Sequence, residues 1–197
     1  MESLYYPLKI VESSFEVKGS CFISFLVGIA QFDSFIQEAR QKHQKAVHFV
    51  SASRYFNEYG QIVESFSDDG EPKGTSGMPT LKVLRGYELV ECGILIVRYF
   101  GGTLLGTGGL VRAYTQGAKD VVLKAKEQNL IAPFEKQEIY SFEIAFSLFS
   151  QVEYLAKKLN ITLNKEFLES GVKIKAQAKG EILSEFKKAV ESLGFKV

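Results

Sequence analysis

The residues best suited to chemistry lie in one stretch of the chain, where a strand, a glycine-rich turn and a helix follow one another. The continuous apolar run 92–97 is typical of a strand that is covered on both faces. After it come the residues that could meet a ligand: Gly101, Gly102, Thr107, Gly108 and Gly109. A helix start offers unpaired N–H groups and a partial positive charge, and glycines let a ligand's oxygens approach the backbone. The stretch therefore predicts an anion-binding turn.

The same glycines also fit a structural interpretation. No Gly-Lys-Ser or Gly-Lys-Thr follows them, so the turn is not a P-loop, and the dinucleotide pattern GxGxxG matches poorly. Glycines also serve tight turns and the close packing of a helix on a sheet. An anion site and a structural turn both remain open on the sequence alone.

Three cations could complete an anion site. Arg98 ends the apolar strand, Arg112 lies in the first turn of the following helix, and Lys73 belongs to the polar loop that precedes them. A guanidinium presents a fork of donors that matches a phosphate or a carboxylate. The alternative is that the arginines form internal ion pairs with the acidic residues of loop 67–77.

The acidic residues of that loop are Asp68, Asp69 and Glu71. Carboxylate oxygens are the ligands that Mg²⁺ prefers. The loop lacks the ligand spacing of a calcium-binding loop, however, and adjacent aspartates usually point apart. The sequence therefore predicts no metal site and leaves the role of these three carboxylates unassigned.

Histidine chemistry has two interpretations. His48 lies in a strand-like segment, where it is either a hydrogen-bonded structural partner or a general base. Only His43 and His48 could supply the imidazole of a nucleophilic triad, and no catalytic serine or cysteine stands out. We therefore predict neither a catalytic residue nor a cofactor.

Composition narrows the class of protein. The 197 residues carry 24 Lys and Arg against 23 Asp and Glu, so no overall field attracts nucleic acid or an anionic membrane. The longest nearly apolar run, 21–30, is too short to span a bilayer. The N-terminus shows no leader pattern, and Cys21 and Cys92 form no CxxC pair. We expect a cytoplasmic protein with free thiols.

Hydrophobic periodicity predicts an α+β protein with two domains, residues 1–132 and 133–197, joined by a linker at 129–134. Strands are expected at 8–18, 20–28, 46–55, 62–66 and 92–97, and helices at 31–43, 79–88 and from 110 to about 126. Asp33 is expected to cap the first helix, and Gly117 costs stability in the third unless a neighbour approaches it closely.

In the second domain a β-α-β-β-α order suggests a ferredoxin-like fold. The strands are expected at 137–145, 161–168 and 172–178, with a last strand at 195–197. A capping box of Ser150 and Glu153 is expected to start its first helix, and the second helix is expected from Glu181.

Three runs of sequence closely resemble the IMPACT/YigZ family. They are 66–79 (FSDDGEPKGTSGMP), 97–102 (VRYFGG) and 105–114 (LGTGGLVRAY), within a similarity that covers about residues 15–128. The segment that follows is similar to the small C-terminal domain of bacterial members.

The resemblance implies a β-α-β first domain like the second domain of a small-subunit ribosomal protein. It also implies a second domain like domain V of elongation factor G. Eukaryotic relatives regulate translation through a starvation-sensing kinase pathway, and folds of this kind often touch RNA. Our first hypothesis is a non-enzymatic protein linked to translation that binds RNA or the ribosome, and binding of a protein partner is a further interpretation. The alternative is an enzyme that holds a small phosphorylated metabolite or nucleotide in the glycine-rich turn.

Overall fold

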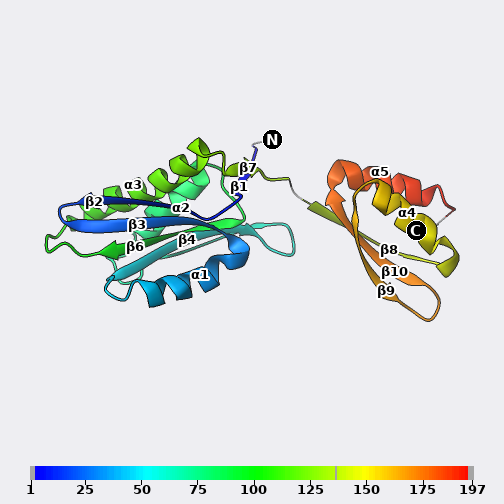
Figure 1. The fold of residues 1–197 in the computed structure, drawn as a ribbon, viewed down its shortest axis with the longest axis horizontal. Helices are drawn as coiled ribbons and strands as arrows, with labels where there is room; N and C mark the ends of the chain where they lie inside the picture. The colour runs from blue at the N-terminus through cyan, green and yellow to red at the C-terminus, as the bar shows by residue number, and fades with distance from the viewer. Residues whose placement is uncertain (1–2, 136, 195–197) are drawn as a thin grey trace. The chain divides into compact units, whose positions relative to one another are not determined.

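The computed structural model describes residues 3–135 and 137–194, and it divides into two compact units between residues 134 and 135 (Figure 1). The sequence placed the division between 132 and 133. Both units combine helices with antiparallel sheet, so the described chain is a mixed α and β protein with five helices.

Unit 1 is built on a five-stranded antiparallel sheet in the order β2-β3-β6-β4-β5. The strands are β2 (Val11–Val17), β3 (Ser20–Gly28), β4 (His48–Phe56), β5 (Ile62–Ser67) and β6 (Cys92–Tyr99). Helix α1 (Ile29–Lys42) covers one face, and α2 (Gly77–Gly86) and α3 (Gly106–Glu127) cover the other (Figure 1). The strand of the apolar run, β6, is the central one, and its two faces are covered as predicted.

Alternation along β6 assigns its side chains to two cores. Leu95 and Val97 pack in the cluster on the α1 side, whereas Ile94 and Ile96 pack in the cluster under α2 and α3. Since side chains two residues apart point to the same face of a strand, Arg98 continues the α3 side. The alternation of side chains along β6 thus points the Arg98 side chain toward the core under α3.

The expected linker is in part a strand. β7 (Ile131–Pro133) pairs antiparallel with β1 (Tyr5–Pro7), and the amide of Phe134 donates to the carbonyl of Leu4 at 2.7 Å. The prediction of a linker over 129–134 is therefore wrong for 131–133. Pro133 fits here because a two-stranded ribbon leaves an edge on which its missing N–H costs no ladder bond.

Unit 2 follows the predicted element order. β8 (Gln137–Ile144), α4 (Phe146–Lys158), β9 (Thr162–Phe167), β10 (Val172–Lys179) and α5 (Gly180–Glu191) form a three-stranded sheet in the order β8-β10-β9 with two helices. The alternating residues of β10 that are buried pack with α4 and α5 in one core. The last strand predicted at 195–197 lies outside the described residues, and the ferredoxin-like assignment stays a prediction.

Two helix starts differ from the predictions for the same physical reason. β3 runs straight into α1 through Gly28 in extended geometry, so Asp33 lies inside the helix and does not cap it. β8 runs into α4 through Ala145 in the same way, so Ser150 is also inside its helix and the capping box is wrong. In both places the helix is started by a direct strand-to-helix turn rather than by a side-chain cap.

Gly117, inside α3, has the close neighbours that the sequence analysis required of a glycine in a helix. A Cβ on Gly117 would stand 2.7 Å from Ser24 Oγ and 3.2 Å from a ring carbon of Phe15. The missing side chain thus lets α3 lie close to β2 and β3. None of the five described helices has the length and apolar character that a bilayer crossing requires.

Candidate functional site

Asp68 holds the start of α2. One carboxylate oxygen accepts hydrogen bonds from the Ser76 amide (3.2 Å), the Ser76 hydroxyl (2.7 Å) and the Gly77 amide (2.8 Å). The other accepts from the amide of Gly74 at 2.8 Å. Partial burial alone would raise the pKa of this carboxyl, but the four hydrogen bonds outweigh it and lower the pKa. Asp68 therefore acts as the cap of α2 from outside the helix.

Asp69 fastens the same loop to β4 and α1. Its Oδ2 accepts a hydrogen bond from the backbone amide of Phe49 at 2.6 Å, and its Oδ1 accepts one from Arg40 Nη2 at 2.6 Å. The Arg40 guanidinium also stacks over the Phe49 ring, 4.6 Å from its centroid. The carbonyl of Asp69 accepts a hydrogen bond from His48 Nδ1 at 2.8 Å.

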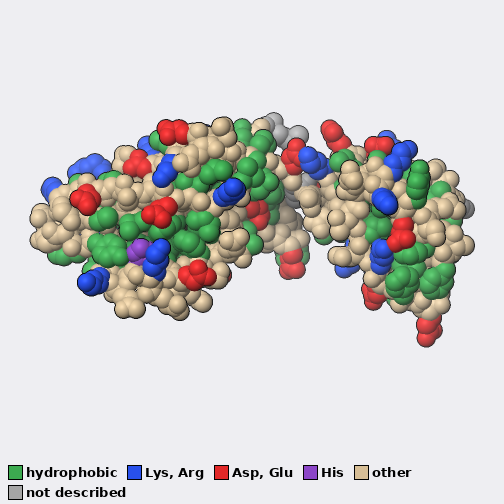
Figure 2. All heavy atoms as spheres, in the orientation of Figure 1, with side chains coloured by type: hydrophobic (Ala, Val, Ile, Leu, Met, Phe, Trp, Pro, Cys, Tyr) green, Lys and Arg blue, Asp and Glu red, His purple; other side chains and the backbone are tan. Residues whose placement is uncertain are grey.

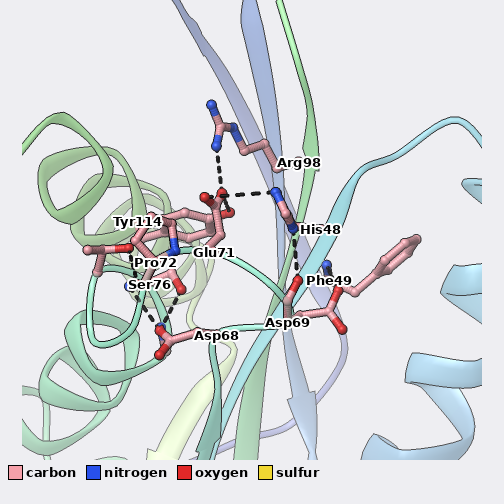
Figure 3. Close-up of polar contacts among 11 residues, drawn as sticks. His48, Phe49, Asp68, Asp69, Glu71, Pro72, Ser76, Arg98 and Tyr114 are labelled. Carbon is pink, nitrogen blue, oxygen red and sulfur yellow. Dashed lines mark hydrogen bonds and ion pairs between the residues drawn. The ribbon is translucent and has the colours of Figure 1, made fainter. Parts of the chain in front are cut away.

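Glu71 is the centre of a buried polar network (Figure 3). Its Oε1 accepts hydrogen bonds from Arg98 Nη1 and from the Tyr114 hydroxyl, both at 2.6 Å. Its Oε2 lies 3.8 Å from His48 Nε2. The side chains of Glu71 and Arg98 are only 3% and 5% exposed. Strand register explains the meeting, because His48 pairs with Arg98 across β4 and β6 on the α3 side.

The network answers two questions that the sequence left open. Arg98 forms the internal ion pair, with Glu71, and His48 is a hydrogen-bonded partner of the acidic loop. Tyr114, which the sequence did not single out as a site residue, is the fourth member of the network, beside Glu71, Arg98 and His48. Burial, and after it the hydrogen bond to Glu71, raises the pKa of Tyr114 far above its usual value, so its proton stays on the hydroxyl.

The three carboxylates of the loop therefore serve three different sets of protein donors. They do not converge, as the ligands of one ion must. Within residues 3–135 and 137–194, no group of three or more His, Cys, Asp or Glu is placed to hold a metal ion.

The glycines after β6 divide into two sets. Gly101 is structural: its amide donates to Ser20 Oγ at 3.1 Å, and a Cβ on it would clash with the backbone of Gly19. Gly102 (φ 83°) and Gly106 (φ 70°) have left-handed backbones at the two ends of an exposed turn. The amide of Gly101 is thus already used by the protein.

The start of α3 has a different character. Its N-cap, Leu105, makes no side-chain capping bond, and, unlike at α2, no side chain of the described residues outside the helix accepts a hydrogen bond from its first amides. Thr107 and Gly108 are exposed, and Gly109 is half-buried. A Cβ on Gly108 would lie 3.8 Å from Arg112 Nη1, which shows that the guanidinium lies beside the first turn.

These amides border a cavity of about 400 Å³, which we call the α3 hollow. Its lining comes from the ends of β4 and β6, the acidic loop and the turn before α3: Val47, His48, Gly70, Glu71, Pro72, Arg98, Phe100, Leu104, Leu105, Gly106, Thr107 and Leu110. Lys73 follows Pro72 in the chain and is exposed. The polar network described above forms part of the wall of this hollow.

Sequence reasoning identified the polar wall of the hollow but missed its apolar residues. Leu104 is 83% exposed, Val47 49% and Phe100 47%. A signal was present, because two large apolar residues stand in or next to a turn between glycines, where a structural turn has no need of them.

Charge is otherwise mixed over the molecule. Figure 2 shows Lys and Arg side chains interspersed with Asp and Glu side chains on both units of the face drawn. This agrees with the nearly neutral composition and makes any anion binding a local property.

Comparisons with known proteins converge on one group. Residues 18–122 match the family described as Impact N-terminal domain. An IMPACT family member of Haemophilus influenzae is 31% identical over 175 residues, which cover 87% of this chain and 83% of that protein. IMPACT family member YigZ of Escherichia coli is 38% identical over 131 residues, 65% of this chain and 64% of that protein. The crystal structure of a hypothetical protein matches with a TM-score of 0.77 at 28% identity, covering 98% of this chain and 93% of that one.

Proposed function

This chain belongs to the IMPACT family, and we propose that it binds RNA of the translation apparatus without catalysing a reaction. The binding site is the α3 hollow with the first turn of α3. The proposal includes action in the cytoplasm, where ribosomes work.

The observation that supports this proposal is the start of α3. A helix of 22 residues begins without a side-chain cap at the edge of a cavity, and the residues of its first turn are Gly106, Thr107, Gly108 and Gly109. Such a terminus offers several N–H groups and a partial positive charge to a phosphate. The glycines leave room for the phosphate to approach the backbone.

Two cations add charge at this place. Arg112 lies along the first turn, and Lys73 stands next to the wall of the hollow. Both are exposed, and neither takes part in an ion pair within the part of the chain that the structure describes. Arg98 has another role: its charge is balanced by Glu71, so we assign it to positioning the wall.

The carboxylates of the acidic loop and His48 supply no second function of comparable support. Asp68, Asp69 and Glu71 each accept hydrogen bonds from protein donors, and His48 is held between Asp69 and Glu71. These are the contacts of a scaffold that fixes a surface. We therefore propose binding rather than catalysis.

The test is a titration of the protein with structured ribosomal RNA at several salt concentrations. Binding should weaken steeply with salt, because each phosphate contact releases counterions. Arg112→Ala and Lys73→Ala should each weaken binding and lower the salt slope by about one. Lys42→Ala, an exposed change on α1 at the opposite face of the sheet, is the matched control and should leave both quantities unchanged.

Failure to bind RNA even at low salt removes the proposal. A small phosphorylated metabolite that stabilises the protein against heat equally at low and high salt would point instead to an enclosed small-molecule site, since a buried phosphate is screened less than a surface contact.

A further inference from the structure

The α3 hollow has an apolar rim that phosphate binding does not explain. Leu104, Val47 and Phe100 are among the exposed large apolar residues of unit 1, and all three belong to the lining of this one cavity. Exposed apolar side chains that gather at a cavity mark a contact site for something apolar or aromatic. A bare phosphate would leave them in water.

In the wall of the hollow, one carboxylate oxygen of Glu71 can still accept a hydrogen bond. Both donors to Glu71, from Arg98 and Tyr114, reach Oε1, whereas Oε2 has His48 Nε2 at 3.8 Å, beyond hydrogen-bond distance. Arg98 Nε is also buried, with no hydrogen-bond partner in the described parts of the chain. A buried donor without a partner is costly, so this wall favours a ligand that brings an acceptor for Arg98 Nε together with a donor for Glu71 Oε2.

The volume of the α3 hollow limits which ligands can enter it. A cavity of about 400 Å³ lies in the range of small-molecule sites and is far too small for a double helix. An unpaired base of a single strand is flat, apolar on its faces and polar at its edge, and such bases are commonly splayed out onto aromatic side chains. The apolar rim, the polar wall and the volume of the α3 hollow thus all fit an unpaired nucleobase.

We propose that the α3 hollow takes one unpaired nucleobase that bears an exocyclic amino group. The ring packs on Phe100 and Leu104, and the amino group donates to Oε2 of Glu71. The inference rests on the proposed function for the source of the base, a single RNA strand. The same chemistry would also accept the base of a free nucleotide, and the experiment separates the two sources.

Oligocytidylate and oligouridylate of equal length make the sharpest pair of probes, because cytosine offers an amino donor beside the acceptor N3, whereas uracil offers a carbonyl acceptor beside an N3–H donor. Fluorescence anisotropy should show the cytidine oligomer binding about tenfold more tightly, since a carbonyl facing Glu71 leaves two acceptors opposed. A duplex of the same length should bind more weakly than the single strand. Cytidine and uridine monophosphates test the free nucleotide.

Variants of the rim test where the base lies. Phe100→Ala should weaken binding of the cytidine oligomer by about five- to tenfold, since stacking of the base on the aromatic ring is lost. Leu104→Ala should also weaken it, since an apolar contact of the base is lost. Both residues are exposed, so the fold should tolerate the changes. Leu123→Ala, another exposed leucine further along α3, is the matched control and should leave binding unchanged.

The outcomes separate the two proposals. Equal binding of both oligomers and the duplex, unaffected by the rim variants, overturns the nucleobase site and leaves RNA binding standing. Preference for cytidine that survives both rim variants also overturns the site, since the base must then be read elsewhere. Binding of cytidine monophosphate that Phe100→Ala weakens, with no binding of any RNA, supports the nucleobase site and overturns the proposed function. Binding of none of the probes removes both.

Discussion

The backbone of Gly101 lies against that of Gly19, so closely that a Cβ on Gly101 would stand 1.8 Å from the carbonyl carbon of Gly19. Gly19 forms the turn between β2 and β3, and Gly101 starts the turn after β6. The amide of Gly101 completes the contact by donating to Ser20 Oγ. The turn before α3 is therefore held in place by a hairpin that is about eighty residues away in the sequence.

Gly101→Ala should be strongly destabilising. The methyl group meets backbone atoms, which cannot rotate away, so the turn and the hairpin must separate. We expect a loss of about 3 kcal/mol or more in the free energy of unfolding, at the upper end of overpacking effects. Chemical denaturation followed by circular dichroism measures it. Gly86→Ala is the matched control, because a Cβ there meets nothing within 4 Å, and it should be neutral or stabilising.

Asp68→Asn tests the external cap of α2 through its pH dependence. The pKa of Asp68 is lowered in the folded protein, so its charge stabilises the fold above the usual aspartate pKa of about 3.9. That stabilisation disappears as the pH falls through the lowered value. We expect the variant to lose about 1–2 kcal/mol at neutral pH and progressively less in acid.

Unfolding free energies of wild type and variant between neutral and acidic pH provide the measurement for Asp68. The exposed Asp33→Asn on α1 controls for the simple loss of a charge. A difference between Asp68→Asn and wild type that stays constant down to low pH contradicts the assigned role.

Glu71→Gln should be more damaging than its small change in shape suggests. It leaves the guanidinium of Arg98 buried without a counter-charge, which costs about 3–5 kcal/mol. Adding Arg98→Met should recover part of the loss, since the buried charge is removed as well. Equilibrium unfolding of the two single variants and the double variant tests this, and additive losses would show that the pair is not coupled.

The two cysteines should differ in their reaction with a thiol reagent. Burial, the largest cause, raises the pKa of Cys92 to about 12, so this side chain stays a protonated and inaccessible thiol at neutral pH. Cys21 is only partly buried. Titration of the native protein should modify one thiol slowly, and Cys21→Ser should abolish that reaction. Both thiols should react after unfolding in guanidinium, and fast modification of Cys92 in the native state would contradict the burial.

Most elements of the fold could be predicted because each carries its own periodicity. The alternation of β10 and the continuous apolar run of β6 are local properties, and so is the buried stripe of α3 that includes Leu110 and Ala118. The starts of α1 and α4 could not be predicted from capping residues. There the strand before the helix continues into it, so the helix is fixed by packing on the sheet instead of by Asp33 or Ser150.

The site was predictable in its residue types but not in its pairings. Sequence placed cations and carboxylates on neighbouring loops, yet several carboxylates could have met Arg98. Arg98 pairs with Glu71 because of the register of β4 against β6 and the position of Tyr114 two turns into α3. Both are features of the tertiary structure, which the local sequence does not reveal. The apolar rim was missed because exposed leucine and phenylalanine are unremarkable one by one and become informative only when they share a cavity.

Gly102 and Gly106, both with left-handed backbones, bracket the three-residue segment 103–105. The bends on either side are supplied by these glycines, so Leu104 at the tip contributes little to the architecture that carries it. Relatives can therefore exchange this tip residue at small cost to folding. Under the proposed function, the ligand selectivity of the α3 hollow and the stability of the fold can then evolve almost independently of each other.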